Sequence, residues 1–375
     1  MSEPALNLMK WTFKLGRFFG IDVFLHFTFL VLLAVIWGSS LISRGPSAAL
    51  EATALWLAVF TCVLLHEYGH ALTARAYGIR TRDITLLPMG GLARLEKMPD
   101  NPWQEIVVAV AGPAVNVVIA ALLGVLILVT GGFGPVENLD LGVAGGSFWQ
   151  RLFAINIGLV VFNLLPAFPM DGGRVLRGVL GLMIDPVRAT KIAAVVGQGM
   201  AVVFVLVAFF AQAPMLFLIA FFVWIGAQAE VGASEERSVL EGVVVRQAIM
   251  TDFHTLGVFD GLRDASALVL RGSQQDFPVL EGGPDGRVAG VLTRAGLMRG
   301  LAAHGLDGRV VEAMDRDLPV VQADDLLEEV LPGLRETGCS AAPVYAGGQL
   351  VGLLTMENIG ELMMIRSALN RRRPR

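Results

Sequence analysis

Six long apolar stretches constrain the fold of this chain more than any other feature of its sequence. A helix needs roughly 20 residues to cross the hydrocarbon core of a bilayer, where an open backbone finds no hydrogen-bond partners. The stretches lie at residues 21–42, 52–74, 104–130, 148–168, 189–211 and 213–229. We therefore predict a polytopic α-helical membrane protein with about six transmembrane helices, formed by residues 21–230.

The rest of the chain is more polar, although charged residues make up only 17% of the whole. We expect residues 1–20 to be a cytoplasmic N-terminal segment and 231–242 a linker. The basic tail at 368–375 should lie near anionic lipid headgroups rather than on nucleic acid. Cys62 and Cys339 lie in different regions, so we expect no disulfide and no need for an oxidising compartment.

An internal duplication follows the linker, with a period of about 63 residues. The first copy, 243–300, contains the run Phe-Pro-Val-Leu that ends at Leu280, and the second, 301–367, contains Ala-Pro-Val-Tyr ending at Tyr345. Each copy has a short helix pattern, β-branched strand patterns and a closing helix pattern. The duplication predicts a C-terminal α/β domain built from two repeats.

Positive charges near the ends of the apolar stretches predict the orientation, because cytoplasmic loops are enriched in Lys and Arg. With the N-terminus in the cytoplasm, the outside segments hold only Arg44 and Arg151. The inside segments hold the remaining flanking cations: Lys10, Lys14, Arg17, Arg75, Arg80, Arg82, Arg94, Lys97, Arg174, Arg177, Arg188 and Lys191. We expect a multi-pass protein of a prokaryotic plasma membrane with both termini and the C-terminal repeats in the cytoplasm.

The second apolar stretch ends in the sequence His66-Glu67-Tyr68-Gly69-His70. Residues four apart share one face of a helix, so both imidazoles can bind one metal ion, and Glu67 is placed to take a proton from water. Ionisable groups are costly at lipid depth and generally serve a function there. The alternative is a polar kink in a transporter helix.

Asp171 is the candidate for a third metal ligand, since catalytic zinc usually has three protein ligands. It follows two prolines and precedes two glycines, which together allow a break in the helix and a tight turn. Its predicted depth matches that of the two histidines. The alternative is a helix-end residue that faces cytoplasmic water.

Residues 62–74 and 156–174 together resemble the site-2 protease family of intramembrane zinc metalloproteases. The resemblance rests on H-E-x-x-H and on the pattern N-x-x-P-x-x-P-x-D-G, and it extends over about residues 10–230. It implies that His66, His70 and Asp171 bind one zinc ion per chain and that Glu67 is the general base. It also implies that the substrates are transmembrane proteins, cleaved within or near their membrane-spanning segments.

Other residues carry weaker expectations. Asn163 is a candidate for a polar catalytic group near the scissile carbonyl. Alternatively, it forms hydrogen bonds with backbone groups that Pro166 leaves unpaired. Asn116 ends a G-P-x-x-N segment that resembles one in the family, and it can bond across the helix bundle. His26 either packs through hydrogen bonds or lies near the metal. Residues 84–95 resemble a sheet-like segment that could pair with an unwound substrate.

The C-terminal repeats resemble tandem cystathionine β-synthase (CBS) domains, which often bind adenine nucleotides and often associate as dimers. In that family an Asp frequently stands three residues after a Thr, whereas here Gly296 follows Thr293 and Asn358 follows Thr355. Adenine nucleotide binding, a structural role and homodimerisation therefore stay open. We expect the pair to regulate an intramembrane zinc metalloendopeptidase. The other classes weighed are a CBS-regulated transporter and an inactive membrane scaffold.

Overall fold

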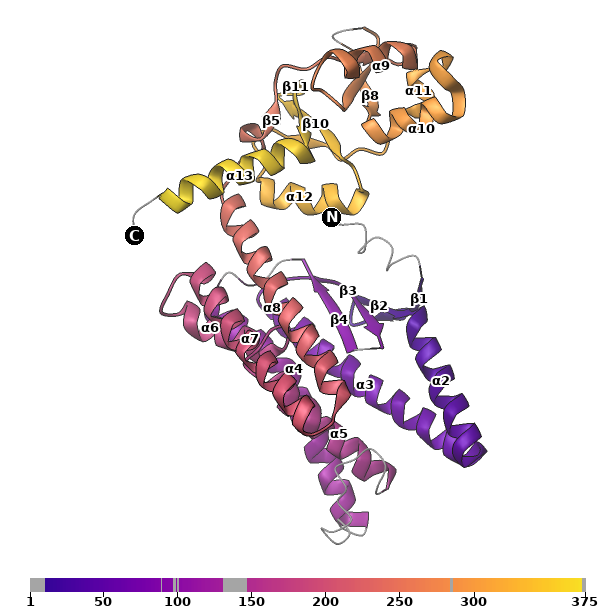
Figure 1. Cartoon of the computed structure of the whole chain (residues 1–375), viewed down its shortest axis with the longest axis vertical. Coiled ribbons are helices and arrows are strands. Elements are labelled where there is room, and N and C mark those ends of the chain that lie inside the picture. The colour runs from indigo at the N-terminus through magenta and orange to yellow at the C-terminus, as the bar shows by residue number, and fades with distance from the viewer. Residues whose placement is uncertain are drawn as a thin grey trace. The chain divides into compact units, whose positions relative to one another are not determined.

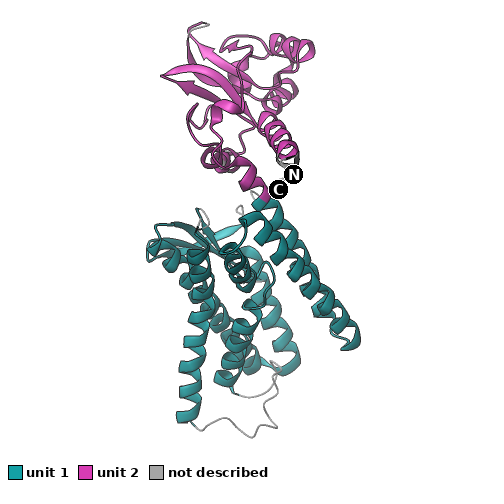
Figure 2. Ribbon diagram, turned by 90° about the vertical axis from the view of Figure 1, so that its left-hand side faces the viewer, with its two compact units in different colours: residues 1–234 teal, residues 235–375 magenta. Residues whose placement is uncertain are grey.

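The computed structural model describes residues 11–88, 90–96, 99, 101–130, 147–283 and 286–372. Lys10, Lys97 and the last three residues of the basic tail lie outside these ranges. The chain divides into two compact units, Met1–Ser234 and Glu235–Arg375 (Figure 2). The division falls within the expected linker at 231–242, and that segment is helical as far as Leu240.

The first unit is a bundle of helices (Figure 1). Five helices in the described part of the chain are long and apolar enough to cross a membrane: α2 (Phe27–Arg44), α3 (Pro46–Ala76), α4 (Pro102–Thr130), α7 (Pro186–Phe210) and α8 (Pro214–Leu240). Helix α5 (Phe148–Asn163) has 16 residues and α6 (Asp171–Gly181) has 11. Large apolar side chains face outward, as lipid requires; Leu122 is 67% and Phe210 80% exposed. The predicted polytopic helical architecture is confirmed.

Two predicted spans have different ends in the structure. The span expected at 21–42 was wrong at its start, because residues Ile21–His26 form strand β2 and the helix begins at Phe27. His26 caps that helix, with its Nδ1 accepting from the backbone N–H of Thr28. The span expected at 148–168 ends at Asn163, since Pro166 cannot continue the helix.

A four-stranded sheet packs against α3. Its order is β1 (Thr12–Phe18), β2, β3 (Thr81–Leu87) and β4 (Gly90–Leu95), so β4 is an edge strand. Strands β2 and β3 are parallel and the other pairs are antiparallel. Val23 and Ile84 are fully buried with Tyr68 and Ala71 of α3. The sheet therefore supports the part of α3 that holds the H-E-x-x-H sequence.

The second unit contains two small sheets and five α-helices among its described residues. One sheet has the order β5 (Ile249–Met250), β11 (Gln349–Thr355), β10 (Ala341–Ala346), β9 (Val321–Gln322), and the other β6 (Leu256–Gly257), β7 (Phe277–Glu281), β8 (Arg287–Leu292). The helices are α9 (Leu262–Arg271), α10 (Arg294–His304), α11 (Val310–Ala313), α12 (Leu327–Thr337) and α13 (Met356–Arg372). Each predicted repeat thus supplies an antiparallel hairpin followed by a helix. The boundary expected at 300/301 falls inside α10.

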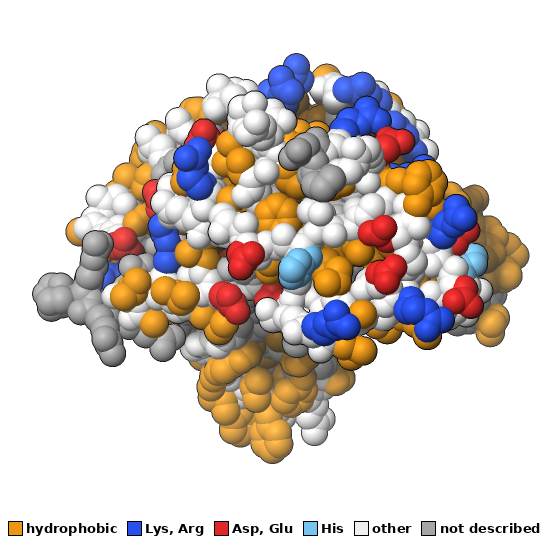
Figure 3. Space-filling model, turned by 90° about the horizontal axis from the view of Figure 1, so that it is seen from above, with side chains coloured by type: hydrophobic (Ala, Val, Ile, Leu, Met, Phe, Trp, Pro, Cys, Tyr) orange, Lys and Arg blue, Asp and Glu red, His pale blue; other side chains and the backbone are white. Residues whose placement is uncertain are grey.

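Strand β5 pairs with β11, so the start of the first repeat completes the sheet of the second. Each sheet has its own apolar core, centred on Leu262 and Phe277 in one case and on Leu327 and Leu354 in the other. On the face shown in Figure 3, charged side chains of both signs are interspersed among hydrophobic and other side chains. Interspersed charge suits contact with water.

A buried carboxylate links the two repeats. Asp276 Oδ1 accepts from the backbone N–H of Arg294 at 3.0 Å and from the Ser340 hydroxyl at 3.3 Å. Burial raises the pKa of the Asp276 carboxyl, and the nearby charges of Glu357 and Asp315 raise it further. An acid whose pKa is raised by folding binds its proton more tightly in the folded chain. Its ionisation therefore lowers stability as the pH rises above the unfolded pKa of about 4.

Replacing Asp276 with asparagine should stabilise the second unit at neutral pH. Asparagine keeps an acceptor oxygen for Arg294 and Ser340 and removes the buried charge. We expect the melting temperature of the second unit in the full chain to rise by a few degrees at pH 7, measured by calorimetry. The gain should shrink as the pH falls toward about 4. A lower melting temperature at pH 7 would show that the charged form is the stabilising one.

Candidate metal centre

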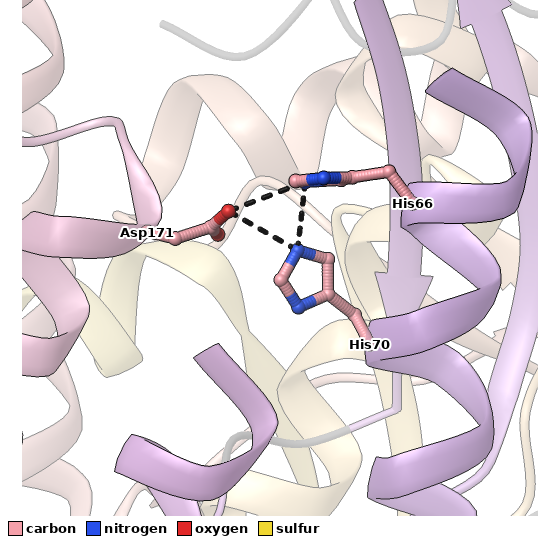
Figure 4. Close-up of side chains that lie close together, drawn as sticks. All are labelled: His66, His70 and Asp171. Carbon is pink, nitrogen blue, oxygen red and sulfur yellow. Dashed lines mark hydrogen bonds and ion pairs between the residues drawn. The ribbon is translucent and has the colours of Figure 1, made fainter. Parts of the chain in front are cut away.

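Helix α3 and the start of α6 bring three potential metal ligands together. His66 and His70 lie one turn apart on α3, and Asp171 is the first residue of α6. The two Nε2 atoms are 3.1 Å apart, and each is 3.2 Å from Asp171 Oδ2 (Figure 4). All three side chains are buried, each with 6–7% of the residue surface exposed. The structure thus brings the three residues predicted from the sequence to one point.

Hydrogen bonds on the far side of each imidazole orient the two rings. His66 Nδ1 lies 2.6 Å from Asn116 Oδ1, and His70 Nδ1 lies 2.8 Å from the carbonyl oxygen of Val108. Both partners are acceptors, so each ring donates through Nδ1–H. Neutral imidazoles of this tautomer present the lone pairs of their Nε2 atoms to Asp171.

The orientation of Asn116 is itself set by a buried chain of hydrogen bonds. Asn116 Nδ2 donates to Asn156 Oδ1 at 2.9 Å, and Asn156 Nδ2 donates to the carbonyl of Leu152 at 2.8 Å. Both asparagines are fully buried. In the sequence, Asn156 interrupts an otherwise apolar span. A lone amide in such a span is the signal that could have identified it as a supporting residue.

These residues fit a divalent cation. Two imidazole lone pairs converge on Asp171 Oδ2, which has no hydrogen-bond donor in the described part of the chain. Such lone pairs repel one another unless a cation lies between them. Two histidines and one carboxylate are a common ligand set for catalytic zinc.

Helix α4 approaches this point through a glycine. A Cβ atom on Gly112 would lie 2.2 Å from His70 Nε2 and 2.7 Å from His66 Nε2. Only a residue without a side chain fits at this position. The close approach shapes one wall of the centre.

Glu67 is half-buried on the same turn of α3 and packs against the edge strand β4. A Cβ atom on Gly91 would lie 2.4 Å from Glu67 Cγ and 2.9 Å from its Oε1. The carboxylate therefore lies close to β4, which is an edge strand of this sheet. Asn163 is half-buried at the end of α5.

The loop before Asp171 is packed tightly enough to hold that carboxylate in place. Phe168 is 1% exposed and packs with alanines of α7 and α8. A Cβ on Gly172 would lie 2.3 Å from the carbonyl oxygen of Leu165, so the turn requires glycine there. Asp171 lies in the first turn of α6, where the helix dipole favours a negative charge.

Comparison with known proteins agrees with this architecture. The model of peptidase family M50 matches residues 54–145 and 143–207, and that of the CBS domain matches 310–364. Zinc metalloprotease MJ0392 of Methanocaldococcus jannaschii is 30% identical over 359 residues, which cover 95% of this chain and 97% of the relative. The solved site-2 protease from the same organism is 34% identical and covers 59% of this chain and 95% of its own, with a TM-score of 0.42.

Together with the apolar helices and the buried ligand cluster, the family match and the relative identify a membrane metalloprotease. The chain belongs to peptidase family M50, the site-2 proteases, and carries C-terminal CBS domains. The predicted enzyme class is confirmed. His66, His70 and Asp171 all lie within the residues that the family model matches.

Proposed function

We propose that this chain hydrolyses peptide bonds within or near transmembrane segments of other membrane proteins. His66, His70 and Asp171 would hold one zinc ion. The observation that carries the proposal is the convergence of three buried donor atoms within a set of membrane-length helices. A transporter would require neither the imidazole tautomers nor the carboxylate that complete this ligand set.

Zinc, when bound, polarises a substrate carbonyl and lowers the pKa of water. The Glu67 carboxylate accepts a proton from the attacking water and later donates it to the leaving amine. Asn116 and the Val108 carbonyl keep the proton of each imidazole on Nδ1, so that Nε2 stays free. Asn163 is proposed to have one of two roles. It donates a hydrogen bond to the substrate carbonyl, or it forms hydrogen bonds with backbone groups that are left unpaired where the helix is interrupted near Pro166.

Strand β4 is the proposed binding edge for substrate. A helical segment hides its carbonyls in its own hydrogen bonds, so a substrate must unwind before it is cleaved. An extended segment that pairs with β4 would have its backbone held beside Glu67, which contacts Gly91. Because this pairing would use main-chain atoms, substrate segments of many different sequences could bind to β4.

Mapping the cleaved bond tests this proposal. Purified protein in lipid vesicles should cleave a single-span membrane protein, and mass spectrometry should place the cut within or beside the apolar segment. A chelator should stop cleavage, and added zinc should restore it. The proposal fails if the products arise only from water-exposed loops far from the membrane, or if cleavage persists after zinc removal.

The second unit is proposed to regulate cleavage from the cytoplasm, with both chain termini on that side. Adenine nucleotide binding and dimerisation are part of this proposal. Thr293 donates to Asp315 Oδ2 at 3.0 Å and Thr355 to Asn358 Oδ1 at 2.5 Å. A nucleotide that used either hydroxyl would have to replace these contacts.

A further inference from the structure

Arg177 is the centre of a buried cluster of ion pairs outside the ligand set. It lies on α6, and its Nε donates to Glu105 of α4 at 2.6 Å. Its Nη1 pairs with Glu230 of α8. The side chains of Arg177 and Glu105 are each 13% exposed, and that of Glu230 is 25% exposed. One planar guanidinium therefore joins three helices, as its forked donors allow.

The same guanidinium contacts the loop that leads to Asp171. Its central carbon lies 5.4 Å from the centroid of the Phe168 ring, three residues before Asp171 in the chain. Arg177 follows Asp171 by six residues, which is about 9 Å along a helix. Helix α6 is only 11 residues long, so contacts of this kind set where its first residue lies.

Helix α8 contacts both the loop and α6. A Cβ on Gly226 would lie 2.7 Å from Pro169 Cδ, so the helix backbone packs directly on the loop. One turn later, Glu230 pairs with Arg177. The same helix continues to Leu240, whose side chain belongs to an apolar core of the second unit. Figure 1 shows α6, α7 and α8 in the same part of the bundle.

We propose that Arg177 is a positioning residue that couples the position of α8, through Glu230, to that of Asp171. The inference rests on the proposed zinc site. Loss of the Glu230 charge leaves Arg177 paired with Glu105 but removes the ion pair between α6 and α8. Asp171 is then held less firmly against the two histidines.

Zinc affinity of the full-length protein, measured by competition with a chromogenic chelator, tests the coupling without any substrate. Glu230→Gln should weaken zinc binding by roughly tenfold, the lower end for residues that orient a metal ligand. The matched control is Glu51→Gln, which also removes a carboxylate paired with an arginine, Arg151, but on the first turns of α3. The control should bind zinc as the wild type does.

Equal zinc affinity of Glu230→Gln, Glu51→Gln and wild type would overturn the inference. If Glu230→Gln does not fold, Glu230→Asp keeps the charge and shortens the side chain, and the same weakening is expected. Circular dichroism of the zinc-free proteins should show the same helix content in the wild type, Glu230→Gln and Glu51→Gln, so that the weaker zinc binding of Glu230→Gln is measured on folded protein. Absence of protease activity in the wild type would contradict the proposed function but not this measurement.

Discussion

Replacing Glu67 with glutamine is expected to lower the rate of cleavage of a transmembrane substrate by at least about 100-fold, the low end for loss of a general base. Glutamine has nearly the same shape but cannot accept the proton of the attacking water. Zinc content should not change, since Glu67 is outside the cluster of His66, His70 and Asp171. The measurement is single-turnover cleavage by purified protein, with bound metal determined on the same sample.

Glu241→Gln is the matched control, because Glu241 is exposed and belongs to the second unit. It should cleave at the wild-type rate. Cleavage by Glu67→Gln at a rate within a few-fold of wild type would remove Glu67 from the mechanism. Loss of zinc from that variant would instead assign Glu67 to the metal.

The substitution Gly112→Ala should weaken metal binding although it replaces no proposed ligand. The added methyl group would lie 2.2 Å from His70 Nε2, closer than any real contact, so an imidazole or helix α4 must move. Either movement separates the donor atoms. We expect zinc affinity to fall by at least about tenfold and cleavage to fall with it.

Gly124→Ala on the same helix is the control for this substitution. Its Cβ would lie 3.4 Å from the Phe153 ring, which is an ordinary contact, so binding and cleavage should be preserved. Normal zinc affinity in Gly112→Ala would mean that the metal lies away from the two Nε2 atoms.

The helices of the first unit could be predicted because the length and hydrophobicity of each apolar run can be read from that run alone. The histidine pair could be predicted for the same local reason, since a spacing of four residues puts both rings on one helix face. Asp171 could be predicted because prolines and glycines mark the break before it and its expected depth matched. These features depend on short stretches of sequence or on membrane thickness.

Features that depend on contacts between distant segments could not be predicted. Strand β2 was read as the start of a helix because its apolar residues continue directly into α2. Strand β2 pairs with β3, which lies about sixty residues later in the chain, and the local sequence does not predict such a pairing. The approach of Gly112 to the imidazoles and of Gly91 to Glu67 likewise appears only once the helices and the sheet are packed.

The central claim is that two imidazoles and one carboxylate of this chain bind the catalytic zinc. X-ray absorption at the zinc edge of the inactive Glu67→Gln variant tests it most directly. The account predicts nitrogen and oxygen neighbours at about 2.0–2.2 Å, with the imidazole signal reduced in His66→Ala and the metal released in Asp171→Ala. A sulfur neighbour at about 2.3 Å, or an unchanged spectrum in either variant, would contradict it.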